Sequence, residues 1–231
     1  MREIKPGQIA FFLLLLALIL LLGIGSTSFF LGALPLGDFR GVTLVMAGAV
    51  LIYLYAFAVY RIFLFFMPLT VGVVAGGSRA EFVVNVYFLF YLLLFNSLIR
   101  THFIPVPLLR LVYLALGARL GSNTFSAGVI LDPPLTRIGK NSIIGHDAVL
   151  FSHVIEGNKL ELKFIQIGDN VTIGATAIVM PGVSIGDGAI VSAGAIVRKD
   201  TCIGEGEVWG GIPARLLKKA VSSPDDMDGS S

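Results

Sequence analysis

Aliphatic residues recur at every sixth position through the second half of the chain. The period begins at Ile138, is interrupted after Leu150, and runs without a slip from Ile167 to Ile203. Hexapeptide periodicity is typical of a parallel β-helix, in which three hexads form one coil and each aliphatic side chain points inward. One coil cannot bury its apolar edge alone, so several must stack. We therefore predict an all-β solenoid over residues 120–212, whose inward positions are Ile138, Ile144, Leu150, Ile167, Ile173, Val179, Ile185, Val191, Val197 and Ile203.

The first half has no such period and is apolar almost throughout, in three stretches over residues 9–31, 42–67 and 82–99. A signal peptide would have a shorter apolar core followed by a soluble protein. The first two stretches are long enough to cross a bilayer of about 30 Å. The third contains Asn85 and Asn96, and it either spans or packs near the interface. Residues 1–101 are therefore expected to form a membrane domain of two to three transmembrane helices, which makes the chain an integral membrane protein with lipid as a partner.

The basic residues around these stretches give the expected orientation. With three spans, the cations of residues 1–8 and the second loop lie on one side, and those of the first loop and of residues 100–119 on the other. The slight excess on the second side favours a cytoplasmic solenoid. Arg61 lies within the second stretch. It either snorkels to the interface or faces a polar cavity and holds an anion such as a lipid phosphate.

Residues 102–119 are predicted to be a helix that connects the two halves. Pro105 and Pro107 lie at its start, where proline is tolerated. Gly117 and Gly121 mark its end. This helix either lies at the membrane surface or caps the first coil. After the solenoid, we expect a short C-terminal helix over residues 213–221 and a disordered tail over residues 222–231.

The single interruption of the period, FSHVIEGNKLELKFIQ, is the first candidate for chemistry. A solenoid accepts an insertion only as a loop that leaves one corner of a coil, often on the binding face. His153 stands at the base of this loop, and a histidine can accept a proton near neutral pH. A hydrogen bond from His153 to the turn backbone is the alternative. Glu156 could orient the imidazole, or it could be a solvated loop residue.

Residues 116–217 resemble the hexapeptide-repeat acyltransferases in three features: the loop at His153, the run IGDNVTIGATAIVMPGVSIGDGAIVSAGAIVRKD, and the closing GGIPARLLKK. The pattern SHVIEGNKLELK is also similar to the membrane-attached acyltransferase modules at the ends of certain nonribosomal peptide synthetase-like enzymes. The resemblance implies a left-handed β-helix that works as a homotrimer. It also implies transfer of an acyl group, with acetyl expected, from a coenzyme A thioester to a hydroxyl or amine, without a permanently bound cofactor.

The same resemblance implies roles for particular residues. His153 corresponds to the general base of that family. The backbone at Ser192, Ala193 and Gly194 would meet the pantetheine arm of coenzyme A, and three cations would meet its phosphates: Lys199, Arg215 and Lys218. These cations could equally be solubilising charges at exposed corners. Many soluble relatives have tryptophan where Thr172 stands, which leaves a carrier-protein thioester open as the donor.

Charge and cysteine content exclude other classes. The formal charge of +2 gives no reason to expect a nucleic acid partner. Cys202 is the single cysteine; it allows no internal disulfide, and we expect it to be a small buried hydrophobe. No zinc motif can be built from one cysteine and three scattered histidines, so no metal site is predicted.

The leading hypothesis is an integral-membrane acyltransferase that acts on a lipid-linked or amphiphilic acceptor. A zinc carbonic anhydrase of β-helix type would need three converging histidines, and His102 precedes the solenoid, which leaves His146 and His153. A non-catalytic trimeric scaffold that assembles membrane partners is the remaining alternative.

Overall fold

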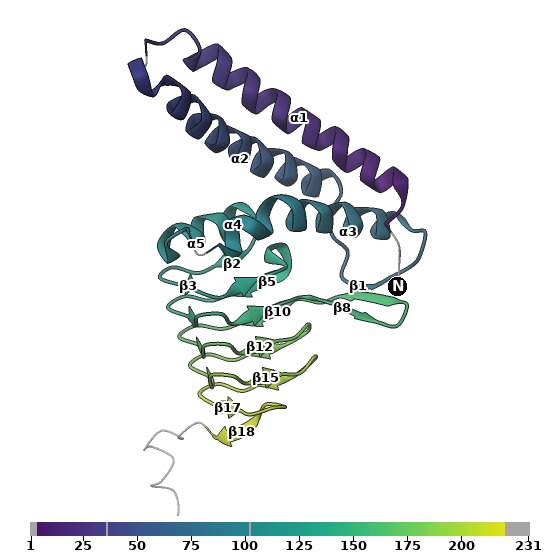
Figure 1. Cartoon of the computed structure of the whole chain (residues 1–231). Coiled ribbons are helices and arrows are strands. Elements are labelled where there is room, and N and C mark those ends of the chain that lie inside the picture. Colours follow the sequence, from purple (N-terminus) through teal and green to yellow (C-terminus); the bar gives the residue numbers. More distant parts are fainter. Residues whose placement is uncertain (1–3, 36, 102, 220–231) are drawn as a thin grey trace, which may run out of the picture. The chain divides into compact units, whose positions relative to one another are not determined.

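The computed structural model describes residues 4–35, 37–101 and 103–219. It divides into two compact units (Figure 1). The helical unit comprises Met1–Thr70 and Val74–Leu98, and the β-helix unit comprises Val71–Val73 and Ile99–Ser231. Residues 71–73 therefore belong to the β-helix unit, although residues 74–98 belong to the helical unit. From residue 99 on, the chain belongs to the β-helix unit.

The helices of the first unit cover the three apolar stretches. They are α1 (Pro6–Leu31), a short 3-10 turn (Gly37–Phe39), α2 (Arg40–Phe66) and α3 (Arg79–Phe90), which continues through a π-helical turn (Tyr91–Phe95) into α4 (Asn96–Arg100). Within the described part of the chain, three helical segments are long and apolar enough to cross a membrane. The segment from α3 to α4 differs from the other two because half of the residues in its most apolar stretch are buried inside the protein.

Aromatic side chains form the core of the helical unit. Phe90 is fully buried, and its ring centroid lies 5.2 Å from that of Phe12, 5.7 Å from that of Tyr60 and 5.9 Å from that of Phe63. Such pairs add about 0.5–1.5 kcal/mol beyond area burial. Arg61 has an exposed side chain, so it does not contribute to this core.

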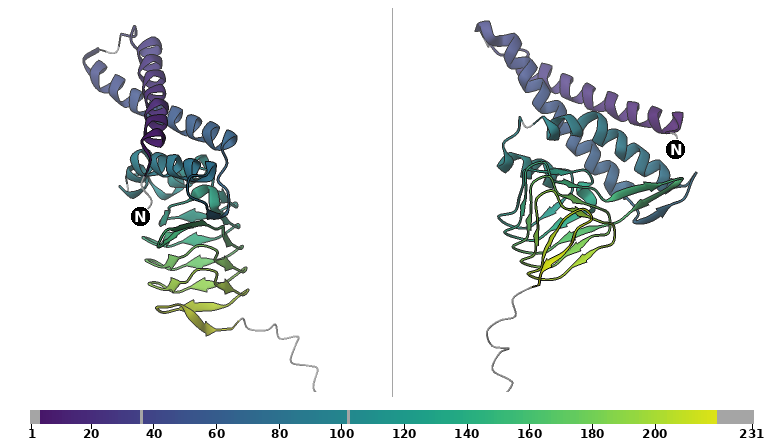
Figure 2. Two further views of the ribbon diagram at one scale, coloured as in Figure 1. Left: turned by 90° about the vertical axis from the view of Figure 1, so that its right-hand side faces the viewer. Right: turned by 60° about the horizontal axis from the view of Figure 1, so that its bottom comes forward.

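The second unit is a three-sided parallel β-helix, whose coils stack in Figures 1 and 2. Its first sheet consists of β2 (Arg119–Leu120), β5 (Thr136–Ile138), β10 (Ile165–Ile167), β13 (Ser184–Ile185) and β16 (Cys202–Ile203). The second consists of β3 (Phe125–Ser126), β6 (Ile143–Ile144), β11 (Thr172–Ile173), β14 (Ile190–Val191), β17 (Val208–Gly210) and β18 (Arg215–Lys218). The third consists of β4 (Val129–Ile130), β7 (Val149–Leu150), β12 (Ile178–Val179) and β15 (Ile196–Val197).

The register confirms the predicted period. Ile167 pairs with Ile185, and Ile185 with Ile203, so successive coils are offset by eighteen residues. All ten predicted inward side chains are buried. The prediction for Cys202 is wrong: this residue is exposed, because it occupies the outward position of β16, beside Ser184 of β13. Side chains alternate along a strand, so the neighbour of an inward residue faces solvent.

The corners repeat with the same offset. Asn170 and Gly188 have positive φ at equivalent turns of neighbouring coils, with values of 56° and 66°. Asparagine and glycine tolerate this left-handed conformation better than other residues. Thr176 also has a positive φ, 58°, which is unusual for a β-branched residue.

Gly174 lies directly against the backbone of the next coil. A Cβ atom there would lie 2.3 Å from the backbone nitrogen of Ala193. We expect Gly174→Ala to destabilise the β-helix by about 1–3 kcal/mol, the usual cost of overpacking, and to lower the Tm by several degrees. Fluorescence of Trp209, the only tryptophan, reports the melting of this unit. Ala175→Ser, at the exposed next residue, is the control, and equal Tm values for both variants would contradict the close approach.

Helix α5 (Val106–Ala115) covers the first coil. The hydroxyl of Tyr113 donates to the Gly128 carbonyl at 2.8 Å and accepts from the Ile130 N–H at 3.2 Å. The Arg110 guanidinium donates to the carbonyls of Thr124 and Gly121, among others. These bonds satisfy backbone groups that the first coil leaves without a neighbouring coil, so α5 serves as the cap that the sequence offered as one of two alternatives.

The predicted C-terminal helix is wrong. The chain instead forms β18, which pairs antiparallel with β17 through Trp209 with Leu216 and Gly210 with Arg215. The last coil would otherwise present an open strand edge, and an added strand covers it. The predicted disordered tail over residues 222–231 lies outside the described residues.

Candidate functional site

The interruption of the hexapeptide period folds as a β-hairpin. Strands β8 (His153–Glu156) and β9 (Lys159–Leu162) pair antiparallel and project from the corner between β7 and β10 (Figure 1). Gly157 has a φ of 59° in the turn, a conformation that suits glycine. Strand β1 (Gly72–Val74) extends the hairpin into a sheet of order β1-β9-β8.

His153 meets a buried carboxylate at the base of this hairpin. Its Nδ1 lies 2.7 Å from Oδ2 of Asp132, whose side chain is only 1% exposed, against 27% for His153. The same Oδ2 accepts the backbone N–H of Ser152 at 2.7 Å. Asp132 is itself held by the 3-10 turn Pro133–Leu135, because its carbonyl accepts from the N–H of Leu135 and the hydroxyl of Thr136. The carboxylate is therefore fixed in position before any substrate binds.

This arrangement changes the protonation of His153. Burial on its own lowers the pKa of the imidazole, but the hydrogen bond to Asp132 and the negative charge of that carboxylate outweigh burial, so the pKa is raised above its usual value of 6.5. A proton on Nδ1 directed at Asp132 leaves the lone pair on Nε2 as the basic site. The pair thus has the orientation and electrostatics of a general base with its positioning carboxylate.

The structure pairs Glu156, for which an orienting role was predicted, with a lysine. Both of its carboxylate oxygens accept from Nζ of Lys199, each at 2.9 Å. The carboxylate that orients His153 is Asp132, which the sequence interpretation missed. The spacing of inward residues is irregular at this site, because Ile130 pairs with Leu150, twenty residues later, where a regular coil has eighteen. The extra residues place Asp132 beside Ser152 of the next coil.

Most of the residues predicted to bind coenzyme A lie apart from His153 within one chain, and Lys199 is the exception. Ser192, Ala193 and Gly194 form the turn between β14 and β15, at the corner between the second and third sheets. Lys199 and the hairpin share the corner between the third and first sheets. Arg215 and Lys218 are exposed on β18, at the far end of the coils. A single chain therefore brings Lys199 and Glu156 together and leaves the other predicted contacts separate.

The described residues contain no group of three or more His, Cys, Asp or Glu side chains that could hold a metal ion. His146 is exposed, with its Nε2 3.2 Å from Asp147. His102 lies outside the described residues.

Residues 164–199 match the family model described as bacterial transferase hexapeptide, six repeats. The β-helix is a hexapeptide-repeat domain. The repeat implies that this domain turns left-handed, as the resemblance predicts. The kinship with membrane-attached modules stays a prediction.

Solved structures give further similarities to the hexapeptide-repeat domain. A hexapeptide-repeat-containing acetyltransferase from Vibrio cholerae is 27% identical, with 46% of this chain and 64% of that chain covered and a TM-score of 0.43. A maltose O-acetyltransferase from Clostridium difficile is 28% identical, with 47% and 62% covered and a TM-score of 0.43. A galactoside acetyltransferase in complex with coenzyme A is 29% identical, with 46% and 56% covered and a TM-score of 0.40. The chain thus spans less than two thirds of each of these structures, and no curated protein matches it.

Proposed function

We propose that the protein is an integral-membrane acyltransferase that moves an acyl group, with acetyl expected, from a coenzyme A thioester to a hydroxyl or amine. The observation that carries this proposal is the Asp132–His153 pair at the base of the hairpin formed by β8 and β9. The match to bacterial transferase hexapeptides supports the reaction class. The acceptor in this proposal is lipid-linked or amphiphilic, because the hexapeptide-repeat domain is joined to apolar helices.

The proposed reaction uses the base form of His153. Asp132 accepts a hydrogen bond from the Nδ1–H of His153. Nε2 removes the proton from the acceptor hydroxyl or amine as the oxygen or nitrogen attacks the thioester carbonyl. The carbonyl oxygen becomes an oxyanion that needs hydrogen-bond donors, which backbone N–H groups can supply. When the tetrahedral intermediate collapses, the carbon–sulfur bond breaks, and the imidazolium returns its proton to the leaving thiolate. The products are the acylated acceptor, free coenzyme A and neutral His153.

A homotrimer would reconcile this mechanism with the separated donor residues. The turn Ser192–Gly194 and the cations of β18 lie on other corners than His153, so they would serve the catalytic pair of a neighbouring subunit. The donor would then lie in a groove between subunits, as the resemblance implies. A mass equal to three chains, measured by light scattering with the detergent contribution subtracted, is the expected result.

The path of the chain supports a two-span membrane topology. Strand β1 precedes α3 and belongs to the same sheet as the hairpin, and residue 99 onward belongs to the β-helix unit again. Both ends of the segment from α3 to α4 are therefore joined along the chain to residues of the β-helix unit, and this connection supports the proposal that they lie on one side of the membrane. In this topology only α1 and α2 cross. Apart from Arg61, which lies within α2, the lysines and arginines other than Arg40 then lie on the same side as the β-helix. The positive-inside rule therefore favours a cytoplasmic β-helix.

Cys202 provides a direct test of this topology, because it is the single cysteine and is exposed. A membrane-impermeant maleimide is expected to label it only after the cells are permeabilised. In a Cys202→Ser background, Thr70→Cys should behave in the same way, whereas Asp38→Cys should be labelled in intact cells. Labelling of Thr70→Cys in intact cells would show three spans instead of two. Labelling of native Cys202 in intact cells would contradict the cytoplasmic assignment.

The reaction class is tested with the full-length protein in neutral detergent. Labelled acetyl-CoA is offered with amine, sugar and lipid-linked acceptors, and both free thiol and acylated product are measured. The proposal expects product and thiol in equal amounts with at least one acceptor class. Acyl carrier protein thioesters are offered in parallel, because turnover with these alone would replace coenzyme A as the donor. No acylated product from either donor would contradict the proposal.

A further inference from the structure

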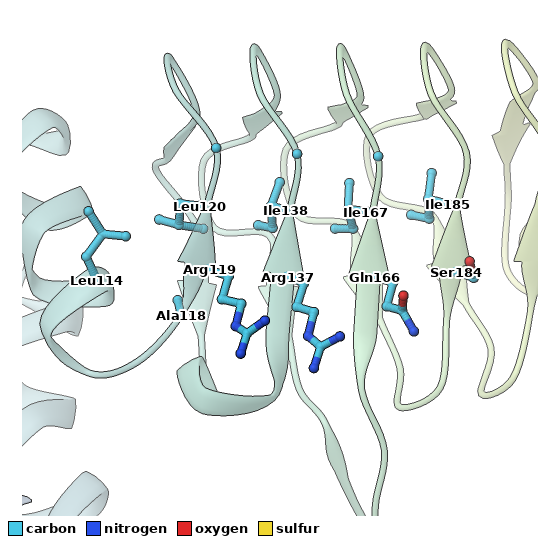
Figure 3. A pocket seen from close by; sticks show the side chains of 13 residues that line it. Leu114, Ala118, Arg119, Leu120, Arg137, Ile138, Gln166, Ile167, Ser184 and Ile185 are labelled. Carbon is cyan, nitrogen blue, oxygen red and sulfur yellow. The ribbon is translucent and has the colours of Figure 1, made fainter. Parts of the chain in front are cut away.

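The outer face of the first sheet carries a row of polar side chains. Arg119, Arg137, Gln166 and Ser184 come from four successive strands and are adjacent in register. In Figure 3, the two arginines and Gln166 project from the same face of their strands. The four residues line an open pocket of about 760 Å³. This volume is within the range of small-molecule sites.

The two arginines concentrate positive charge in this pocket. They are direct neighbours on β2 and β5, and adjacent strands lie about 4.8 Å apart. Like charges directly opposite each other on a sheet destabilise it. Among the described residues no carboxylate forms an ion pair with either arginine, and the guanidinium of Arg137 lies instead 4.3 Å from the ring centroid of Phe164. The repulsion between the arginines is therefore not offset by acidic side chains.

Two lysines at the corner between the third and first sheets form ion pairs with carboxylates. Lys163 donates to both carboxylate oxygens of Asp200, and Lys199 to both of Glu156. These two lysines therefore differ from Arg119 and Arg137, which have no carboxylate partner among the described residues. An anion from outside the chain would complete the pair at Arg119 and Arg137.

The shape of the pocket indicates what kind of anion fits. Two forked guanidinium groups side by side suit a phosphate, whose oxygens accept paired hydrogen bonds. Next to Arg119, the pocket wall is apolar and comes from Leu114 in the last turn of α5 and from Ala118, just before β2 (Figure 3). We propose that Arg119 and Arg137 bind the phosphate group of an amphiphile whose apolar part lies along Leu114 and Ala118.

The proposed phosphate site is near the catalytic pair along the chain. Arg137 follows Asp132 by five residues, so their Cα atoms are at most about 18 Å apart. Phe164, whose ring lies against the guanidinium of Arg137, is two residues beyond the end of the hairpin that begins at His153. If the proposed function holds, the phosphate-bearing amphiphile is the acyl acceptor. Binding of the amphiphile does not depend on that function.

The test measures binding to the full-length protein in neutral detergent. Dihexanoyl phosphatidic acid is the probe, dihexanoylglycerol is the matched amphiphile without phosphate, and coenzyme A and inorganic phosphate represent other phosphate sources. The binding variant is Arg119→Gln/Arg137→Gln. The control variant, Arg198→Gln/Lys159→Gln, removes two exposed cations of the β-helix unit outside this pocket. Arg137→Lys keeps the positive charge but loses the paired N–H donors of the guanidinium group.

We expect the binding variant to bind phosphatidic acid at least about tenfold more weakly than wild type, because hydrogen bonds to charged groups carry about that much affinity each. The control variant should bind like wild type, Arg137→Lys should be intermediate, and dihexanoylglycerol should bind more weakly to every protein. Wild-type binding that holds without any acyl transfer would support the phosphate site and remove only its assignment to the acceptor.

Three outcomes would overturn the proposal. Equal affinity of the binding variant and the wild type for phosphatidic acid would show that the arginines do not contact the phosphate. Loss of coenzyme A binding alone would assign the pocket to the donor. A smaller oligomer in the binding variant, measured by light scattering, would show that the arginines face a second copy of the chain.

Discussion

Replacing His153 with alanine is expected to lower the kcat of acyl transfer by about 10²–10⁴-fold, the range that a positioned general base supplies. The KM for acetyl-CoA should change only a few-fold, because the imidazole acts on the acceptor proton and not on the body of the donor. The measurement is the initial rate of acceptor-dependent thiol release from acetyl-CoA by the full-length protein, over a range of donor concentrations.

His146→Ala is the matched control. His146 is exposed at a regular corner and adjoins Asp147, so its loss should leave the rate close to that of wild type. A His153→Ala rate within about threefold of wild type would remove His153 from the mechanism. A large loss of rate in His146→Ala would show that the corner at His146 contributes to the reaction.

Replacing Asp132 with asparagine is expected to lower the rate strongly, by up to about 10⁴-fold, the loss known for the corresponding change in a serine protease triad. The amide can present its N–H₂ to Nδ1, which favours the tautomer with the proton on Nε2 and removes the basic site. Asparagine keeps the size of the side chain, so this loss does not require a cavity. With the amide in this orientation, the buried N–H of Ser152 loses its acceptor, so the Tm should fall by several degrees, whereas circular dichroism should stay close to that of wild type.

The pH dependence gives an independent readout of the same substitution. Asp132 raises the pKa of His153, and the base form exists only above this pKa, so wild-type kcat/KM should rise with pH through a value above 6.5. In Asp132→Asn, His153 stays buried but loses the hydrogen bond and the negative charge that raise its pKa. The pKa of His153 should therefore fall, and the rise of kcat/KM should move to lower pH. An unchanged rise would show that Asp132 does not control the titration of His153.

Glu156→Gln separates the two carboxylates of the site. Glu156 pairs with Lys199 near the surface, and exposed ion pairs are worth about 0–1 kcal/mol. Its replacement should therefore change the rate only a few-fold and leave the pH profile unchanged. If Glu156→Gln matched Asp132→Asn in both respects, the orienting role would have to be shared between the two residues.

The sequence was sufficient to predict the β-helix because each inward side chain repeats one physical requirement, burial against the coil above and below. Ile173 shows this directly: it lies fully buried between Ile144 and Val191. Cys202 was predicted wrongly although the period was right, because its inward neighbour Ile203 already fills that strand's place in the core. The C-terminal strand was missed because pairing with β17 overrides the local preference of a cationic, leucine-containing segment.

Asp132 could not be identified from the repeat alone. It lies in an insertion between Ile130 and β5, and its partner His153 lies in a second insertion one coil later. Neither segment follows the hexapeptide period, so the period does not predict that they lie side by side. The pairing of Ile130 with Leu150 in the structure shows that they meet at one corner. The donor residues were harder still, because their predicted roles involve more than one subunit.

The measurement that tests the catalytic pair most directly is the acyl-transfer rate of the double variant His153→Ala/Asp132→Asn compared with His153→Ala alone. Residues that act as a unit lose activity non-additively. Since Asp132 is proposed to act only through His153, the double variant should be no more than about threefold slower than His153→Ala. A double variant slowed by the product of the two separate losses would show that Asp132 and His153 contribute independently, which contradicts a general base oriented by its buried carboxylate.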